Sequence, residues 1–120
     1  MKIEPMFVPS DQEFLEELGV QPEPIDEYGG RVLRFVNADR GEALQLTYDL
    51  MEQIVAYRWW VDGVLVADVV RDAVTDLRIV GMSRTSVEAR YGVPDYHGVL
   101  VIDIHPRVIV TDQVLRGSAS

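Results

Sequence analysis

Hydrophobic and polar residues alternate along most of this chain with the two-residue period of a β-strand. In residues 42–49, Leu44, Leu46 and Tyr48 occupy one set of alternate positions, and polar residues such as Gln45 occupy the other. Because alternate side chains of a strand lie on opposite faces, this segment predicts a strand with one buried face. The same pattern predicts strands over residues 31–37, 54–61, 64–70, 76–80, 85–91, 99–105 and 107–115, with a loop over residues 92–98.

Residues 54–70 contain the clearest turn signal in the chain. Asp62 and Gly63 lie between two apolar runs, and both residues tolerate the positive φ angles of a type I′ turn. Valine, isoleucine, tryptophan and tyrosine crowd both runs, as is typical of packed strands. We therefore predict a two-residue β-hairpin, to which the remaining strands are added.

The hairpin can be given a register. A two-residue turn pairs Trp60 with Leu65 and Arg58 with Ala67, so that Arg58 and Asp68 lie on opposite faces. Neither face of this hairpin is cleanly polar. A solvated face would carry polar residues, so we expect both faces to be covered by a second sheet, a helix or a partner.

One short helix is predicted over residues of about 11–18. Ser10 and Glu13 have the spacing of a capping box, and Gly19 follows as a C-terminal stop. Two turns of helix do not persist alone in water, so the helix must dock on the sheet. Its docking stripe would consist of Phe14, Leu15 and Leu18.

Together these elements predict a mainly β fold (all-β or α+β) with one N-terminal helix packed on the sheet. About eight short antiparallel strands would form a meander, because every connection is short. Alternation leaves open whether the meander forms a rolled sheet, a sandwich or a small barrel. At 120 residues we expect a single domain, comprising an acidic arm (1–30), a β body (31–116) and a loose tail (117–120).

Charge is unevenly distributed along the chain. The net charge is −9, and residues 1–30 hold eight acidic residues against one lysine. Such an acidic field disfavours nucleic acid and attracts a basic protein partner. The alternative is a solvated arm that only aids solubility. With no cysteine, no apolar run near the roughly 18 residues of a membrane span and no apolar leader, we expect a cytoplasmic protein without membrane attachment.

Adjacent tryptophans in one strand must point to opposite faces, so Trp59 and Trp60 do not share one core in a flat sheet. Tryptophan, tyrosine and arginine also dominate binding hot spots. The alternative is that these aromatic residues are ordinary core. The predicted partner-binding residues are Tyr57, Arg58, Trp59 and Trp60 of the hairpin with Glu13, Glu16 and Glu17 of the helix.

A metal site has one weak candidate, because Asp103 and His105 share a face of a predicted strand. Two ligands fall short of the three or four of a zinc site, so no metal or other cofactor is expected. The alternative is that Asp103 pairs with a neighbouring arginine such as Arg90 or Arg107.

No catalytic motif is found in the sequence, and we expect no enzyme activity. The residues to test for it would be Asp95, His97, Asp103 and His105. The leading hypothesis is a non-catalytic protein-binding module, of the kind represented by immunity proteins and antitoxins, that neutralises a basic protein. One alternative is a small-molecule pocket with Arg58 or Asp68 at its floor. Another is a homo-oligomer such as a homodimer.

Overall fold

The computed structural model describes residues 6–27, 29–81, 85–93 and 96–116. One α-helix, one short 3-10 helix and a series of strands follow one another in these ranges. In chain order they are α1 (Asp11–Leu18), β1 (Glu23–Pro24), β2 (Gly30–Asn37), η1 (Ala38–Arg40), β3 (Glu42–Asp49), β4 (Ile54–Val61), β5 (Val64–Arg71), β6 (Val74–Gly81), β7 (Thr85–Val93), β8 (Tyr96–His105) and β9 (Ile109–Arg116).

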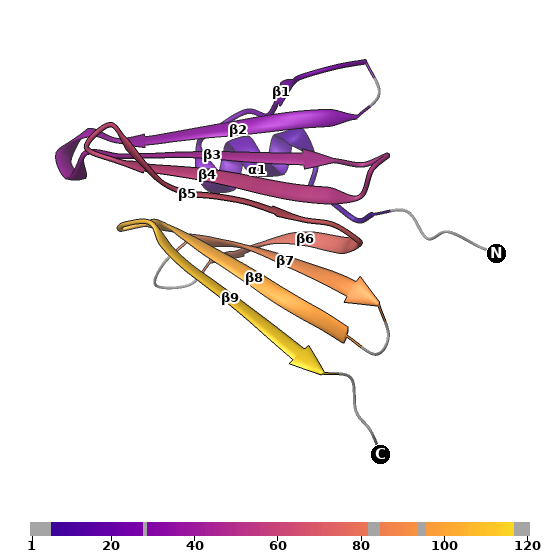
Figure 1. The fold of residues 1–120 in the computed structure, drawn as a ribbon. Helices are drawn as coiled ribbons and strands as arrows, with labels where there is room; N and C mark the ends of the chain where they lie inside the picture. Colours follow the sequence, from indigo (N-terminus) through magenta and orange to yellow (C-terminus); the bar gives the residue numbers. More distant parts are fainter. Residues whose placement is uncertain (1–5, 28, 82–84, 94–95, 117–120) are drawn as a thin grey trace.

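The strands form two antiparallel sheets (Figure 1). Strands β1 to β5 make a five-stranded sheet and β6 to β9 make a four-stranded sheet, each with its strands in chain order. The predicted mainly β meander with one N-terminal helix is therefore confirmed. The sequence left open a rolled sheet, a sandwich or a small barrel, and the chain forms two separate sheets. The strand beyond the eight predicted is β1, which is two residues long.

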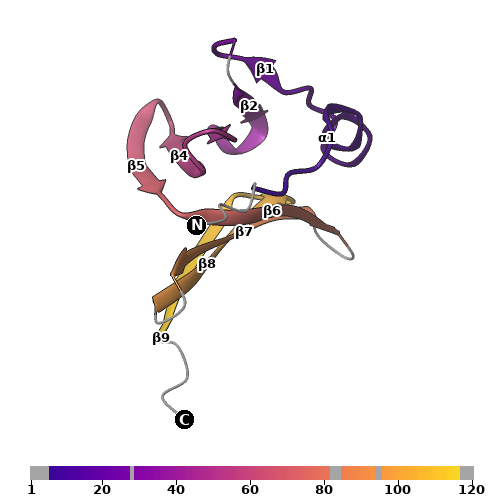
Figure 2. The ribbon, with the colours of Figure 1, turned by 90° about the vertical axis from the view of Figure 1, so that its right-hand side faces the viewer.

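One core fills the space between the two sheets. Leu44, Leu46 and Tyr48 of β3 are at most 2% exposed, as their alternation predicts. Leu77 of β6 and Leu100 of β8 contribute to the same cluster from the other sheet. The five-stranded sheet curls from β5 on one side to β1 on the other, and α1 lies on the β1 side (Figure 2).

Helix α1 is held at both ends by the predicted signals. The backbone N–H of Glu13 donates to the Ser10 side chain at 3.1 Å, and Gly19 ends the helix with φ of 72°. Phe14 is buried and stacks on Tyr48, with ring centroids 5.7 Å apart. Leu15 was predicted to belong to the docking stripe, but it is 43% exposed, because a two-turn helix buries a narrower stripe.

Two strand predictions were wrong on the second sheet. Residues 92–98 were predicted as a loop, but β7 extends to Val93 and β8 begins at Tyr96. Gly98 is tolerated in β8 because the Tyr91 ring covers it; a Cβ at Gly98 would lie 2.2 Å from Tyr91 Cζ. Such aromatic cover compensates for a strand glycine.

The second concerns Ser86, because the alternation of residues 85–91 predicts Val87 and Ala89 on the buried face and Ser86 on the solvent face. Ser86 is 6% exposed, and its hydroxyl donates to the Asp103 carboxylate at 2.6 Å. The register of β7 against β8 shifts between Thr85 and Ser86, and this irregularity turns the Ser86 side chain inward.

An ion-paired cluster ties the two sheets together at one end. The Arg71 Nε of β5 donates to Asp112 of β9 at 2.8 Å, and the Tyr91 hydroxyl of β7 donates to the same carboxylate at 2.6 Å. Burial and the hydrogen bond to Asp112 raise the pKa of Tyr91. Sequence alternation does not indicate this cluster, because its members come from three separate strands.

Candidate functional site

The β4–β5 hairpin has the predicted turn but not the predicted register. Asp62 and Gly63 have φ angles of 49° and 78°, and Trp60 pairs with Leu65. Trp59 then pairs with Ala67, which leaves Val66 as an extra residue in β5. Such a bulge moves every later β5 side chain to the other face.

The bulge corrects the placement of Arg58 and Asp68. They pair across the strands on one face, and Arg58 Nε lies 3.4 Å from Asp68 Oδ1. Both side chains are about half exposed on the outer face of the sheet. Neither residue points into the core, and both line a hollow on the outer face together with Gln45 and Thr47. The alternative of a ligand pocket at Arg58 and Asp68 stays a prediction.

One end of the five-stranded sheet carries an apolar row on its outer face. Cross-strand pairing connects one residue from each of four strands, and we call this set the apolar row. Its members are Val36 of β2, Ala43 of β3, Trp60 of β4 and Leu65 of β5. Val36 is 78% exposed and Leu65 is 46% exposed. Neither the second sheet nor the helix therefore covers this part of the outer face, and cover by a partner stays a prediction.

The row beside it is polar and internally bonded. Arg34, Gln45, Arg58 and Asp68 are cross-strand neighbours. The Arg34 guanidinium donates to Gln45 at 3.2 Å, and its Nε donates to Glu23 of β1 at 3.0 Å. These contacts fix the polar row in place beside the apolar row.

Trp59 points to the opposite side of β4, toward the four-stranded sheet. It is half-buried beside a groove that it lines together with Glu42, Val61 and Val110, and we call this hollow the Trp59 groove. Arg40 and Arg107 also line it. The groove has a volume of about 440 Å³. The two tryptophans thus occupy two sides of the same sheet end.

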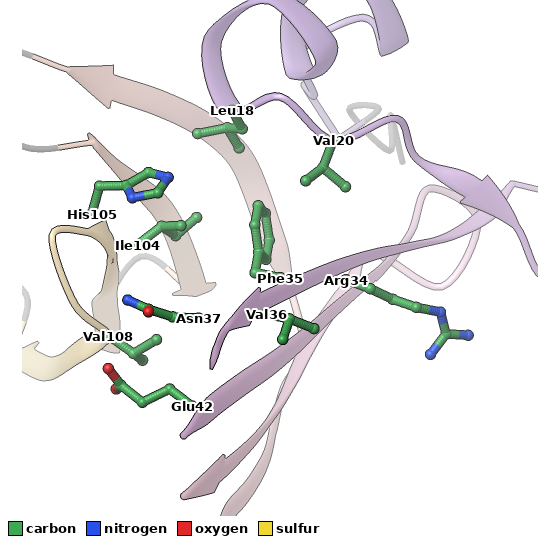
Figure 3. Close-up of a pocket in the computed structure, with 10 residues that line it drawn as sticks. All are labelled: Leu18, Val20, Arg34, Phe35, Val36, Asn37, Glu42, Ile104, His105 and Val108. Carbon is green, nitrogen blue, oxygen red and sulfur yellow. The ribbon is translucent and has the colours of Figure 1, made fainter. Parts of the chain in front are cut away.

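Glu42 also lines a second hollow, of about 230 Å³ (Figure 3). Phe35, Ile104 and Val108 supply apolar lining there, and the Asn37 amide donates to the Pro106 carbonyl at 3.4 Å. Glu42 is only 8% exposed. It occupies an inward position of β3, in step with Leu44, and this signal for a buried carboxylate was present in the sequence.

The remaining predicted binding residues lie elsewhere. Tyr57 is 6% exposed and belongs to the core, and burial raises the pKa of its hydroxyl. Glu13, Glu16 and Glu17 are exposed on α1. Figure 2 shows β5 at one end of the curled five-stranded sheet and α1 near the other end. The acidic helix and the hairpin therefore form two separate surfaces.

The residues considered for a metal site or for catalysis do not come together as a site in the described ranges. Asp103 is buried and accepts a hydrogen bond from Ser86, whereas His105 and His97 are exposed. No group of three or more histidine or acidic residues suited to hold a metal ion occurs among the described residues. Asp95 lies outside those residues. None of the described helices is long and apolar enough to cross a membrane.

Comparison with known proteins places the fold. No protein-family model matches the sequence, and no curated protein matches it significantly. Among solved structures, the chain is similar to a chain of a contact-dependent growth inhibition toxin–immunity protein complex from Klebsiella pneumoniae 342, with a TM-score of 0.82 and 15% sequence identity. The similarity covers 96% of this chain and 100% of that chain. This two-sheet fold is therefore one that occurs in a toxin–immunity complex.

Proposed function

We propose that this protein is the immunity component of a toxin–immunity pair, and that it binds and neutralises a basic protein partner in the cytoplasm. The observation that carries the proposal is the apolar row, in which Trp60 lies at the centre of an exposed sheet face. Tryptophan flanked by aliphatic residues and an arginine has the composition of a binding hot spot. The structural neighbour supports the choice of partner, because its complex pairs a toxin with an immunity protein.

The acidic helix has a different role in this proposal. Glu13, Glu16 and Glu17 are exposed on α1, which lies at the other end of the curled sheet from β5 (Figure 2), so in this proposal they lie outside the contact surface. Their charge still acts at a distance, because a net charge of −9 attracts a basic protein before contact. Trp60 and its neighbours then supply the short-range contacts that keep the complex together.

The test begins with affinity capture from the source organism, using the wild-type protein, Trp60→Asp and Val114→Asp. Val114 is a matched control because it is 45% exposed on β9, in the other sheet. We expect one protein to be retained by the wild type and by Val114→Asp and lost with Trp60→Asp. Circular dichroism establishes that each variant is folded. Equal retention by all three proteins would remove the apolar row from the interface.

The captured protein is then expressed in a bacterial host with and without this chain. An immunity function predicts that the partner alone slows growth and that co-expression of the wild type, but not of Trp60→Asp, restores it. A partner that is harmless alone would exclude a toxin. Sedimentation of the wild type alone tests the alternative of self-association, which predicts a dimer that Trp60→Asp dissociates.

A further inference from the structure

Trp59 contains an unsatisfied hydrogen-bond donor. Its Nε1–H is buried and has no hydrogen-bond partner among the described residues. A buried N–H without an acceptor costs free energy, and such groups are rare in native proteins. The indole is therefore suited to donate to an acceptor that arrives with a ligand.

Glu42 presents the complementary group in the same groove. The residue is 8% exposed, and none of the hydrogen bonds or ion pairs between described residues involves its carboxylate. The pairing of β3 with β4 sets Glu42 opposite Val61 and Leu44 opposite Trp59, so both groups lie on the inner face of neighbouring strands. The groove thus offers one accessible acceptor, Glu42, and one buried donor, Trp59 Nε1.

Apolar residues at the start of β9 also line the groove. Val108, Ile109 and Val110 lie where β9 begins, and in the described structure β9 pairs with β8 on one edge only. A volume of about 440 Å³ is within the range of ligand sites, which run from roughly 300 to 1,000 Å³. An outermost strand beside an apolar groove is a common docking place for extended peptides.

The charges in the groove select among possible ligands. A lone cation would suit Glu42 but would meet Arg40 and Arg107, which also line the groove. A lone carboxylate would suit the arginines and Trp59 but would be repelled by Glu42. A peptide amide is neutral and carries both an acceptor and a donor, so it satisfies Trp59 and Glu42 together.

We infer that the Trp59 groove binds an extended peptide segment, in which one main-chain carbonyl accepts from Trp59 Nε1 and one main-chain N–H donates to Glu42. Arg40 and Arg107 favour an acidic side chain beside that amide. The inference rests on the proposed function in that the natural source of the segment is the protein partner. Trp60 of the apolar row and Trp59 of the groove lie on the two sides of one sheet end, so a partner that contacts the row can also extend a segment into the groove.

The experiment uses a displayed library of random decapeptides selected on the wild-type protein, with Trp59→Phe as the counter-selection. We expect peptides that bind the wild type and carry an aspartate or glutamate. Trp59→Phe and Glu42→Gln should each weaken a selected peptide by about tenfold, as expected for loss of a hydrogen bond and of a charged acceptor. The matched control Glu52→Gln, at an exposed residue that does not line the groove, should change its affinity by less than about twofold.

A second readout follows the indole protons by ¹⁵N–¹H spectroscopy, which is simple because the chain has two tryptophans. Peptide addition should shift the Trp59 Nε1–H signal and leave the Trp60 signal in place.

Three results would overturn the inference: no peptide enriched against Trp59→Phe, equal affinity for wild type and Glu42→Gln, or a shift of the Trp60 signal alone. Because the probe is a peptide, these results are independent of the capture experiment with Trp60→Asp. Failure here leaves the immunity proposal standing with a different contact surface. A partner captured without toxicity leaves the peptide site standing with a different function.

Discussion

The Arg58 guanidinium lies 3.4 Å from the Asp68 carboxylate because β5 contains one extra residue, Val66, opposite β4. In an unbulged hairpin Asp68 would lie on the core side of the sheet, where an unpaired carboxylate is costly. The bulge therefore places both charges in solvent and leaves Val69 to face inward. It also fixes which side chains surround Trp60 on the outer face.

The ion pair itself should add little stability. Arg58 and Asp68 are 55% and 48% exposed, and water screens such a pair. A double-mutant cycle with Arg58→Ala and Asp68→Ala, measured by urea unfolding, should give a coupling of about 0.5 kcal/mol or less. A coupling above about 1.5 kcal/mol would mean that the polar row acts as one cooperative network.

Gly98 should be one of the least replaceable residues in β8. A Cβ there would lie 2.2 Å from the Tyr91 ring, so Gly98→Ala must displace the ring that also bonds Asp112. We expect a loss of about 1–3 kcal/mol in the free energy of unfolding. Gly81→Ala is the control, because nothing lies within 4 Å of its Cβ position. Equal effects at the two glycines would contradict the packing argument.

Alkaline pH should destabilise the protein partly through Tyr48. Burial, with a smaller contribution from Asp11, raises the pKa of Tyr48 to about 12 in the folded state, against about 10 in the unfolded chain. The neutral hydroxyl therefore stabilises the fold fully below about pH 10, and this contribution is lost as the pH rises toward 12.

Between about pH 9 and pH 11 the loss in the free energy of unfolding amounts to about 1 kcal/mol. Tyr48→Phe removes the titrating group and keeps the ring that stacks on Phe14. Its free energy of unfolding, followed by denaturant titration across this range, should fall less than that of the wild type. The same pH dependence in both proteins would assign the alkaline loss to other groups.

The acidic helix and the apolar row should affect different rate constants for partner binding. The triple variant Glu13→Gln, Glu16→Gln, Glu17→Gln should slow association at low salt, and the difference should disappear as salt screens the field. Trp60→Ala should instead speed dissociation. Surface-immobilised partner and a salt series give both rate constants. A faster dissociation of the triple variant would place the helix in the contact surface.

Local signals in the sequence were sufficient for much of the fold. Ser10, Glu13 and Gly19 set the bounds of α1, and Asp62 with Gly63 set the hairpin turn, because these residues act through backbone bonds within a few positions. The alternation in β3 also gave its buried face, since strand period and burial coincide there.

The candidate site was less accessible to sequence reasoning, because it depends on register. Strand alternation indicates nothing about the extra residue Val66, so Asp68 was assigned to the wrong face. Val36 belongs to the apolar row because it pairs with Ala43, Ala43 pairs with Trp60, and Trp60 pairs with Leu65. Alternation indicated that Trp59 and Trp60 face opposite ways, but it did not indicate which of the two faces outward.

The apolar row takes one outward residue from each of four consecutive strands, while inward residues of those strands, such as Phe35 and Leu44, belong to the core. Recognition and folding are therefore encoded at different positions of the same strands. Substitution of Val36 or Leu65 can alter the partner that is recognised without repacking the interior. The outward positions can therefore vary while the two-sheet architecture is kept.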